Sequence, residues 1–261
     1  MRDHMDTTVR NIGASCTTDD AFLGGRLQIL QPAKGLRAGI DPVFLAAATH
    51  AKSGERILEA GVGVAVASLC LATRVPDLGI TGVELQSELC ELATENVQRN
   101  GLARSIHILE GDIAASAKSW CEAGLLPESF DHVIANPPYY DSRKTRRALD
   151  PVKECAHVCN DGSLEQWVRF MVRLARPKAR ITLIHKADAL PQLLNLLQNR
   201  IGDIEIHPLF PAEDSPASRI IVSGTKGSRG PLNICPGIVL HQPDGGYTAQ
   251  AQRILRDAKA Y

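Results

Sequence analysis

The sequence has no excess of either charge and few aromatic side chains. Lysine and arginine together number 29, as do aspartate and glutamate, and aromatic residues make up 4% of the 261 residues. A net charge of zero excludes a global positive field that would attract nucleic acid, so any such contact has to rest on a local basic patch. Hydrophobic residues at 44% and charged residues at 22% exclude a largely disordered or fibrous chain.

A hydrophobic run long enough for a membrane helix is also missing. The longest apolar stretch, Ala60–Ala72, is shorter than the ~20 residues that a span needs. The first twenty residues are polar and contain no apolar leader segment. The seven cysteines are an odd number scattered along the chain, which favours reduced thiols over a disulfide framework. We therefore expect a cytoplasmic protein with no membrane contact.

One cluster of metal-ligating residue types is present. Cys155, His157 and Cys159 lie within five positions of one another. Structural zinc sites draw four ligands from paired clusters, and the sequence offers no second cluster. We therefore expect no metal site and an ordinary segment with reduced thiols here.

Short apolar segments alternate with amphipathic ones from Arg56 onward, which predicts strands alternating with helices. The predicted strands are Arg56–Glu59, Ile80–Glu84, Ser105–Leu109, Asp131–Ala135, Arg180–His185, Asp203–Leu209 and Arg219–Ser223. Helices are expected at Ala65–Arg74, Ser87–Asn100, Ile113–Trp120, from Ser163 to about Leu174, and at Ala187–Asn199. This alternation predicts an α/β fold, with a doubly wound, mostly parallel seven-stranded sheet, helices on both faces and an antiparallel last strand.

The residues before Arg56 are expected to form an extension of this core. Residues 1–20 are predicted to be a flexible tail, and 21–261 a single domain made of an extension, 21–55, and a Rossmann-like core, 56–261. Arg26–Gln31 has the alternation of a short strand. Asp41-Pro42 can begin a helix that continues to His50, because Pro is favoured at the first helical position.

The turn after the first core strand is rich in glycine. Gly61 and Gly63 lie between a strand and a helix, where a doubly wound sheet binds a nucleotide-type ligand. Glu84 ends the second strand, and a carboxylate there can accept both hydroxyl protons of a ribose. The alternative is a glycine-containing turn with no ligand, and Glu84 argues against it. Asp112 ends the third strand, where it can contact a ligand, cap the following helix, or do both.

The fourth strand ends in Asn136-Pro137-Pro138-Tyr139, which is a more specific signal. The prolines fix their own φ angles, so the turn is held at little cost in entropy. The Asn136 amide oxygen and the Pro137 carbonyl could accept the two N–H bonds of a planar amine. Tyr139 offers a ring that can stack on a base, so we expect a Phe at this position to retain much of the activity. A proline-rich strand end without chemistry is the alternative.

Taken together, Glu59–Ala65, Glu84, Asp112 and Asn136–Tyr139 resemble the motifs of class I S-adenosylmethionine-dependent methyltransferases that act on amino or amide nitrogens. The upstream segment narrows the resemblance: Gly25-Arg26, Gln31-Pro32, Lys34–Asp41 and Phe44–Ala47 resemble the bacterial tRNA1(Val) adenine N6-methyltransferase family, which modifies the anticodon-loop adenine at position 37. The resemblance runs from about Gly24 to the C-terminus. Glu59 and Ala65 stand where this motif commonly has Asp and Gly.

The resemblance implies roles for individual residues. S-adenosylmethionine is the implied cofactor. Gly61 and Gly63 flank its methionine part, and Glu59 lies near its amino group. Glu84 with Leu85 holds its ribose, and Asp112 with Ile113 reads its adenine. Arg37 and Asp41 close the entrance, unless they form a surface pair or a helix cap. Asn136, Pro137 and Tyr139 form the catalytic set, and Asn136 also borders the cofactor.

A basic run directly follows the Tyr139 turn. Arg143, Lys144, Arg146 and Arg147 stand where phosphates flanking a bound base would pass, although a charge run is also typical of a solvated surface. Arg219, Lys226 and Arg229 are candidates to extend this surface. The expected partner is RNA, in particular tRNA, and both a monomer and a homodimer stay open.

Other functions share part of this pattern. A protein glutamine N5-methyltransferase shares the Asn-Pro-Pro-Tyr chemistry but carries a helical domain ahead of it, and only 55 residues precede Arg56. A ribosomal RNA guanine N2-methyltransferase typically has a second similar domain, and a DNA adenine methyltransferase needs a target-recognition domain. An RNA-binding or cofactor-sensing module without catalysis has no need of the amine-accepting turn.

Overall fold

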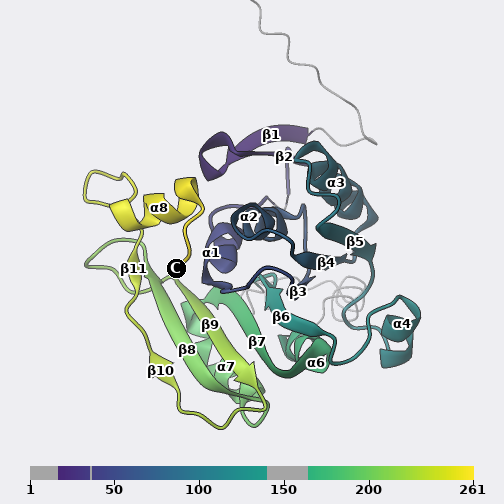
Figure 1. Cartoon of the computed structure of the whole chain (residues 1–261). Coiled ribbons are helices and arrows are strands. Elements are labelled where there is room, and N and C mark those ends of the chain that lie inside the picture. The colour runs from purple at the N-terminus through teal and green to yellow at the C-terminus, as the bar shows by residue number, and fades with distance from the viewer. Residues whose placement is uncertain (1–16, 36, 140–163) are drawn as a thin grey trace, which may run out of the picture.

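A nine-stranded sheet forms the centre of the computed structural model, which describes residues 17–35, 37–139 and 164–261 (Figure 1). The strand order is β10-β8-β9-β7-β6-β3-β4-β5, and β11 pairs with β8. The strands are β3 (Arg56–Ala60), β4 (Gly79–Glu84), β5 (Ile106–Glu110), β6 (Phe130–Ala135), β7 (Ala175–Lys186), β8 (Ile201–Phe210), β9 (Arg219–Lys226), β10 (Asn233–Ile234) and β11 (Ile238–Val239).

Most of this sheet is parallel. β5, β4, β3, β6 and β7 run parallel to one another, whereas β9 runs antiparallel to both β7 and β8. The predicted α/β sheet with an antiparallel end is therefore confirmed. The prediction of seven strands misses β10 and β11, which have two residues each. A segment that short leaves no detectable period in a sequence.

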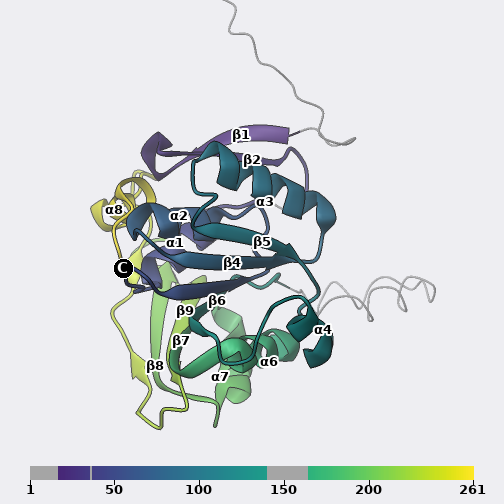
Figure 2. The same ribbon diagram turned by 45° about the vertical axis from the view of Figure 1, so that its right-hand side comes forward.

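Helices cover both faces of the sheet (Figure 2). α1 (Asp41–Ala48), α2 (Val66–Arg74) and α3 (Ser87–Arg99) lie on one face, and α6 (Leu164–Leu174) and α7 (Leu190–Leu197) lie on the other. Successive residues of a strand point to opposite faces. Ile57 accordingly belongs to the hydrophobic cluster that includes α1, α2 and α3, and Leu58 to the cluster that includes α6 and α7. Burial on both faces explains the nearly continuous apolar runs of the central strands.

A two-stranded hairpin precedes the core. β1 (Thr17–Phe22) pairs antiparallel with β2 (Leu27–Pro32), and a short 3-10 turn (Leu23–Gly25) connects them. The prediction of a flexible tail is therefore wrong for residues 17–20. The sequence of β1 is polar and therefore does not indicate a strand. Its acidic side chains serve as ion-pair partners: Asp19 pairs with Arg99 at 2.6 Å. Residues 1–16 lie outside the described part of the chain.

Two helices begin three or more residues after their predicted starts, and a third is not predicted. α4 spans Ala117–Glu122 instead of Ile113–Trp120, because Ser116 caps it by accepting a hydrogen bond from Ser119 N–H. Before α7, the residues Ala187–Ala189 form a 3-10 turn, and a proline stands in the first helical turn. α8 (Ala249–Asp257) has no counterpart among the predicted helices; Thr248 caps its N-terminus. None of the described helices is long and apolar enough to cross a membrane.

The sheet brings the motif-bearing turns together. Ala60, the last residue of β3, is paired with Val83 on one side and with Ala135 on the other. The glycine turn, Glu84 and the Asn136–Tyr139 turn therefore begin at the same edge of the sheet, at the carboxyl ends of three adjacent strands. Ligands bind at this edge in open α/β sheets.

Candidate functional site

The glycine turn connects β3 to α2 through three residues with positive φ. These are Gly61 (+63°), Gly63 (+55°) and Ala65 (+71°). At Gly61 a side chain is excluded, because an added Cβ would lie 2.3 Å from Cη2 of Trp167 on α6. The Val62 N–H donates to the Val83 carbonyl at 2.9 Å and ties the turn to β4. Ala65 shows that the turn tolerates a methyl group at the third position with positive φ, although the left-handed backbone conformation is less favourable for alanine than for glycine.

Glu84 is fixed against this turn. It is 7% exposed, and its Oε2 accepts a hydrogen bond from Gly63 N–H at 3.0 Å. Its Oε1 accepts from the backbone N–H groups of Leu85 (3.0 Å) and Gln86 (3.1 Å). The carboxylate thus has one orientation before any ligand binds. Leu85 beside it is 53% exposed, which presents apolar surface next to a fixed acceptor.

Glu59 is a buried carboxyl group behind the glycine turn. It is 3% exposed, and both the N–H (2.9 Å) and the hydroxyl of Ser68 donate to its Oε2. Burial raises the pKa of Glu59 to about 8, although the two Ser68 bonds act to lower it. At neutral pH the group is therefore largely protonated in the unliganded protein. Sequence reasoning misses Ser68, on the first turn of α2, because Ser is common at helix starts.

Asp112 and Ile113 follow β5 in a tight turn. Asp112 Oδ1 accepts a hydrogen bond from Ala114 N–H at 2.7 Å, and the Asp112 carbonyl accepts from Nε1 of Trp120 at 3.1 Å. Asp112 is exposed, whereas Ile113 is half-buried and packs against the cluster that includes α6 and α7. The alternative that Asp112 caps the next helix is wrong, since Ser116 holds that position.

Tyr139 joins residues from four parts of the chain. Its Oη lies 2.6 Å from Oδ2 of Asp41, at the start of α1, and 3.0 Å from Oδ1 of Asn136. Nε of Arg219, the first residue of β9, donates to the same Asp41 oxygen at 2.9 Å. The Arg219 guanidinium also lies over the Tyr139 ring, 4.7 Å from its centroid. The His185 ring packs edge-on against it with centroids 5.0 Å apart, and Nζ of Lys186 is 5.7 Å from the Tyr139 centroid.

The charges of this cluster reinforce one another. Burial and then the negative charge of Asp41 raise the pKa of Tyr139, so its hydroxyl keeps its proton at neutral pH. Burial acts to lower the pKa of Arg219, but the hydrogen bond to Asp41, the negative charge of Asp41 and the contact with Tyr139 together outweigh burial, and the pKa is raised. Burial lowers the pKa of His185, which favours the neutral form of its ring.

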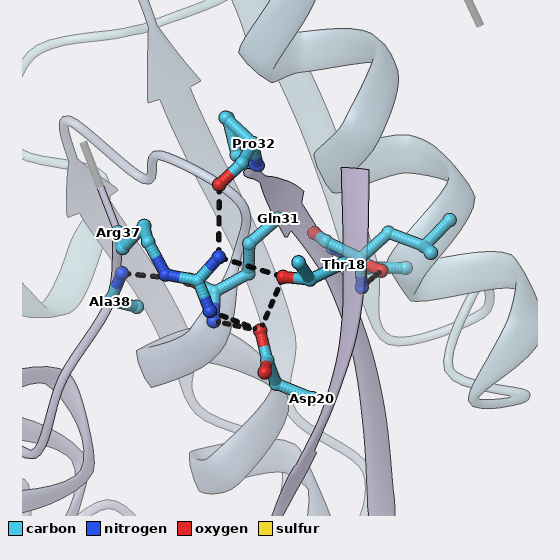
Figure 3. A network of polar contacts seen from close by, with 8 residues as sticks. Thr18, Asp20, Gln31, Pro32, Arg37 and Ala38 are labelled. Carbon is cyan, nitrogen blue, oxygen red and sulfur yellow. Dashed lines mark hydrogen bonds and ion pairs between the residues drawn. The ribbon is translucent and has the colours of Figure 1, made fainter. Parts of the chain in front are cut away.

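Arg37 follows the hairpin in the chain and lies in a different network, with partners in β1 and β2 (Figure 3). Its Nη2 donates to Oδ2 of Asp20 at 2.7 Å, and its Nη1 donates to Oγ1 of Thr18 (2.7 Å) and to the Pro32 carbonyl (3.1 Å). Gln31, 1% exposed, donates to the same Asp20 oxygen at 2.9 Å. Arg37 thus pairs with Asp20 instead of Asp41. The alternative that Arg37 and Asp41 form a surface pair is wrong, because their side chains belong to separate networks. Their closing of the entrance stays a prediction.

Two sets of predicted residues cannot be placed. Arg143, Lys144, Arg146 and Arg147, and the Cys155, His157 and Cys159 cluster, lie outside the described residues. Within the described ranges, no group of three or more His, Cys, Asp or Glu side chains could hold a metal ion. Of the residues expected to extend the basic surface, Arg219 lies at Tyr139, and Lys226 donates to Glu128 (2.9 Å) and to the Ala175 carbonyl (2.7 Å).

The fold and this site together define a class I methyltransferase that uses S-adenosylmethionine. The model of the methyltransferase small domain family matches residues 40–158, which include the glycine turn, Glu84, Asp112 and the Asn136–Tyr139 turn. The protein is an S-adenosylmethionine-dependent N-methyltransferase.

In sequence the chain resembles the tRNA1(Val) (adenine(37)-N6)-methyltransferases. It is 26% identical over 230 residues to the one from Proteus mirabilis, covering 87% of this chain and 88% of the relative. It is 28% identical over 199 residues to the one from Porphyromonas gingivalis, covering 72% and 76%. The resemblance drawn from the sequence motifs is thus confirmed over most of both chains.

Solved structures show the same fold. A crystal structure described as a predicted O-methyltransferase from Agrobacterium tumefaciens superimposes with a TM-score of 0.71 and 26% identity, covering 85% of this chain and 98% of that one. An S-adenosylmethionine-dependent O-methyltransferase from Thermotoga maritima gives a TM-score of 0.52 at 18% identity, covering 75% and 68%. The second similarity concerns the fold alone.

Proposed function

We propose that the protein transfers the methyl group of S-adenosylmethionine to the exocyclic N6 of an adenine in structured RNA, namely the anticodon-loop adenine of a tRNA. One observation carries this proposal: the Asn136–Tyr139 turn follows β6 directly beside the glycine turn, since Ala135 and Ala60 are paired in the sheet. An amine-accepting turn thus adjoins the proposed cofactor site. The relatives named tRNA1(Val) (adenine(37)-N6)-methyltransferase support adenine as the base and tRNA as the substrate.

The residues present fit the cofactor. An added Cβ at Gly63 would meet no atom within 4 Å, so open space adjoins the glycine turn. Glu84, fixed by three backbone N–H groups, is a suitable acceptor for the ribose hydroxyls, and the exposed Leu85 suits the flat face of a purine. In this proposal Glu59, Gly61 and Gly63 hold the methionine part, and Asp112 and Ile113 the adenine. When bound, S-adenosylmethionine supplies a methyl group that its positive sulfonium already activates.

The acceptor side orients a weak nucleophile. The lone pair of an exocyclic amine is delocalised into the purine ring. Hydrogen bonds from its two protons to the Asn136 side-chain oxygen and the Pro137 carbonyl would let the nitrogen pyramidalise and concentrate its electron density. Positive charge develops on the nitrogen only as the methyl group arrives, so no general base has to act beforehand. Positioning supplies most of the rate enhancement in such a reaction.

RNA recognition is the finer part of the proposal. A base has to leave its stack to reach the Asn136–Tyr139 turn, which costs least in a loop. We assign Arg143, Lys144, Arg146 and Arg147, which follow this turn in the sequence, to contacts with flanking phosphates. A cytoplasmic location, where tRNA is modified, belongs to the same proposal.

The test compares acceptors directly. Purified enzyme is given labelled S-adenosylmethionine with unmodified tRNAs or with a glutamine-bearing release-factor peptide. The turn could accept any planar amine, so it does not choose between the two acceptors. Because the relatives are named for tRNA adenine, we expect label in tRNA and none in the peptide. Label in the peptide and none in any tRNA would overturn the RNA assignment in favour of a protein glutamine N5-methyltransferase.

A second assay isolates the basic run. Replacing Arg143, Lys144, Arg146 and Arg147 with glutamine should raise the KM for tRNA and flatten its salt dependence, by roughly one unit of slope for each phosphate that the protein no longer neutralises. The cofactor Kd should not change, because the run lies on the acceptor side of the site. An unchanged salt slope would remove these four residues from the RNA interface.

A further inference from the structure

Asp41 and Arg219 reach the acceptor turn from distant parts of the sequence. Asp41 begins α1 and Arg219 begins β9, 178 positions apart, yet Arg219 Nε donates to Asp41 Oδ2 at 2.9 Å. The same Asp41 oxygen lies 2.6 Å from the Tyr139 hydroxyl, which in turn lies 3.0 Å from the Asn136 side chain. One continuous chain of polar contacts therefore leads from Arg219 through Asp41 and Tyr139 to the residue proposed to accept the amine.

The single hydroxyl proton of Tyr139 determines the direction of the hydrogen bonds in this series of contacts. A tyrosine hydroxyl has a single proton, so Tyr139 cannot donate to both Asp41 and Asn136. The carboxylate is the stronger acceptor, and 2.6 Å is the length expected of an O–H···O⁻ hydrogen bond. Tyr139 therefore donates to Asp41, and its oxygen is left only as an acceptor toward Asn136.

This arrangement determines which end of the Asn136 amide faces Tyr139. Two oxygens with no proton between them repel at 3.0 Å, so the contact is favourable only when the amide turns its nitrogen to Tyr139 and donates. The oxygen and nitrogen of an amide have nearly the same shape, so this half-turn needs no additional space. The amide oxygen then faces away from the hydroxyl and stays available to the incoming amine.

We propose that Asp41 and Arg219 are positioning residues that act through the Tyr139 hydroxyl to orient the Asn136 amide, with its oxygen free for the acceptor amine. The catalytic consequence rests on the proposed N-methylation. Asp41 and Arg219 contact Tyr139 rather than the reacting atoms. Arg219 keeps Asp41 in place as an acceptor, and its guanidinium also holds the Tyr139 ring. The hydroxyl of Tyr139 thus has a role of its own, in addition to any stacking by the ring.

The reaction itself is a balanced displacement. The amine nitrogen forms a bond to the methyl carbon as the sulfur–carbon bond breaks, which leaves S-adenosylhomocysteine. The methylated nitrogen then loses one of its two protons to solvent. With the amide oriented as proposed, Asn136 accepts one of these protons in a hydrogen bond throughout the displacement. With the opposite orientation its N–H group would face the amine and repel it.

A double-mutant cycle tests the kinetic consequence. Tyr139→Phe keeps the ring but removes the hydroxyl. Stacking alone predicts that this variant retains much of its activity, whereas the contacts of the hydroxyl lead us to expect kcat to fall about tenfold, the effect of a neutral hydrogen bond. Asp41→Asn should lower kcat severalfold, and the double variant should be no slower than Tyr139→Phe alone, because Asp41 acts through that hydroxyl. The KM for S-adenosylmethionine should not change. Tyr247→Phe and Asp19→Asn are the matched controls, since they make the same chemical changes away from the site.

Two kinetic outcomes would overturn the proposal. One is a Tyr139→Phe variant with full kcat, which would leave only the ring to act. The other is a double variant whose loss equals the product of the single losses, because Asp41 and Tyr139 would then act independently. Thermal melting of each variant shows whether a loss reflects unfolding, and the ion-pair control Asp19→Asn calibrates that measurement.

An NMR experiment tests the orientation without any substrate. Protein labelled with ¹⁵N at asparagine should show one side-chain amide signal that disappears in Asn136→Ala. We expect Tyr139→Phe and Asp41→Asn to shift this signal and to speed its hydrogen exchange, while Asp19→Asn leaves it unchanged. An Asn136 signal that Tyr139→Phe does not alter would overturn the proposal. A shift together with no methyl transfer to tRNA would instead refute the proposed function and leave the orientation intact.

Discussion

The two halves of the site are built in different ways. On the cofactor side, each functional group lies within a few residues of the strand that positions it: Gly61 and Gly63 follow β3, and Glu84 ends β4 and accepts from its own two successors. On the acceptor side, Tyr139 depends on Asp41, 98 positions away, and on Arg219 beyond it. The cofactor side is thus encoded locally, whereas the acceptor side exists only in the folded chain.

This difference predicts that variants on the acceptor side lower kcat, whereas variants on the cofactor side weaken cofactor binding. Asn136→Ala should show the largest effect. It removes the proposed acceptor of the amine, which acts as charge develops, and removing one such group typically costs about 10²–10³-fold in kcat. Cofactor affinity, measured by calorimetry, should stay nearly the same. Asn195→Ala, an exposed change on α7, is the control. A variant that loses cofactor binding and transfer in parallel would contradict the separation.

Glu84→Ala should give the opposite pattern. A hydrogen bond to a charged group contributes about 1.5–3 kcal/mol, so we expect the Kd for S-adenosylmethionine to rise roughly tenfold to a hundredfold. The Gly63, Leu85 and Gln86 N–H groups also lose their acceptor, which loosens the turn. Calorimetry on this variant and on Glu88→Ala, an exposed change on α3, isolates the effect. An unchanged Kd in a folded variant would refute the ribose assignment.

The contrast between local and long-range contacts also explains how much of each half of the site can be predicted from the sequence. The apolar runs of β3 and β4, the glycines and Glu84 all lie within one local strand–turn–helix–strand pattern, so this part of the site is predictable together with its strands. The Asn136–Tyr139 turn is also recognisable. The sequence places Arg219 in a basic surface, because no local pattern links it to a tyrosine 80 positions earlier. The sequence offers a surface pair of Asp41 with Arg37, a near neighbour along the chain, only as an alternative, and in the structure the two belong to separate networks.

Gly61→Ala should destabilise the fold where the cofactor side meets α6. Its Cβ would clash with Trp167 at 2.3 Å, in addition to adopting a positive φ. Gly54→Ala is a matched control, since Gly54 also has a positive φ (+84°) but no atom within 4 Å of an added Cβ. We expect Gly54→Ala to cost about 1 kcal/mol of unfolding free energy and Gly61→Ala about 1–3 kcal/mol more. Equal losses in urea unfolding would show that the contact with Trp167 is not limiting.

A different kind of effect concerns pH. The pKa of Glu59 is raised to about 8 in the folded protein, above its unfolded value, so its contribution to stability is full below about pH 4.5 and decreases as pH rises through 8. His132, His185 and His207 have lowered pKa values and act in the opposite direction between acidic and neutral pH. The difference between wild type and Glu59→Gln isolates the Glu59 contribution, and a difference independent of pH would contradict it.

The proposed placement of Glu59 near the cofactor amino group makes a related prediction. An ammonium group beside Glu59 favours its ionised form, so cofactor binding near pH 7 should release a proton. Calorimetry in buffers with different ionisation enthalpies measures that release. We expect it in the wild type and not in Glu59→Gln. Binding without proton exchange in the wild type would refute the assignment of the cofactor's amino group to a place beside Glu59.

The central claim, N6-methylation of tRNA adenine at the Asn136–Tyr139 turn, is tested most directly by nucleoside mass spectrometry. RNA is taken from cells that lack the gene and from the same cells supplied with the wild-type chain or with Asn136→Ala. We predict that N6-methyladenosine in the tRNA fraction is absent without the gene, returns with the wild type and does not return with Asn136→Ala. Equal N6-methyladenosine in the tRNA of all three strains would contradict the claim.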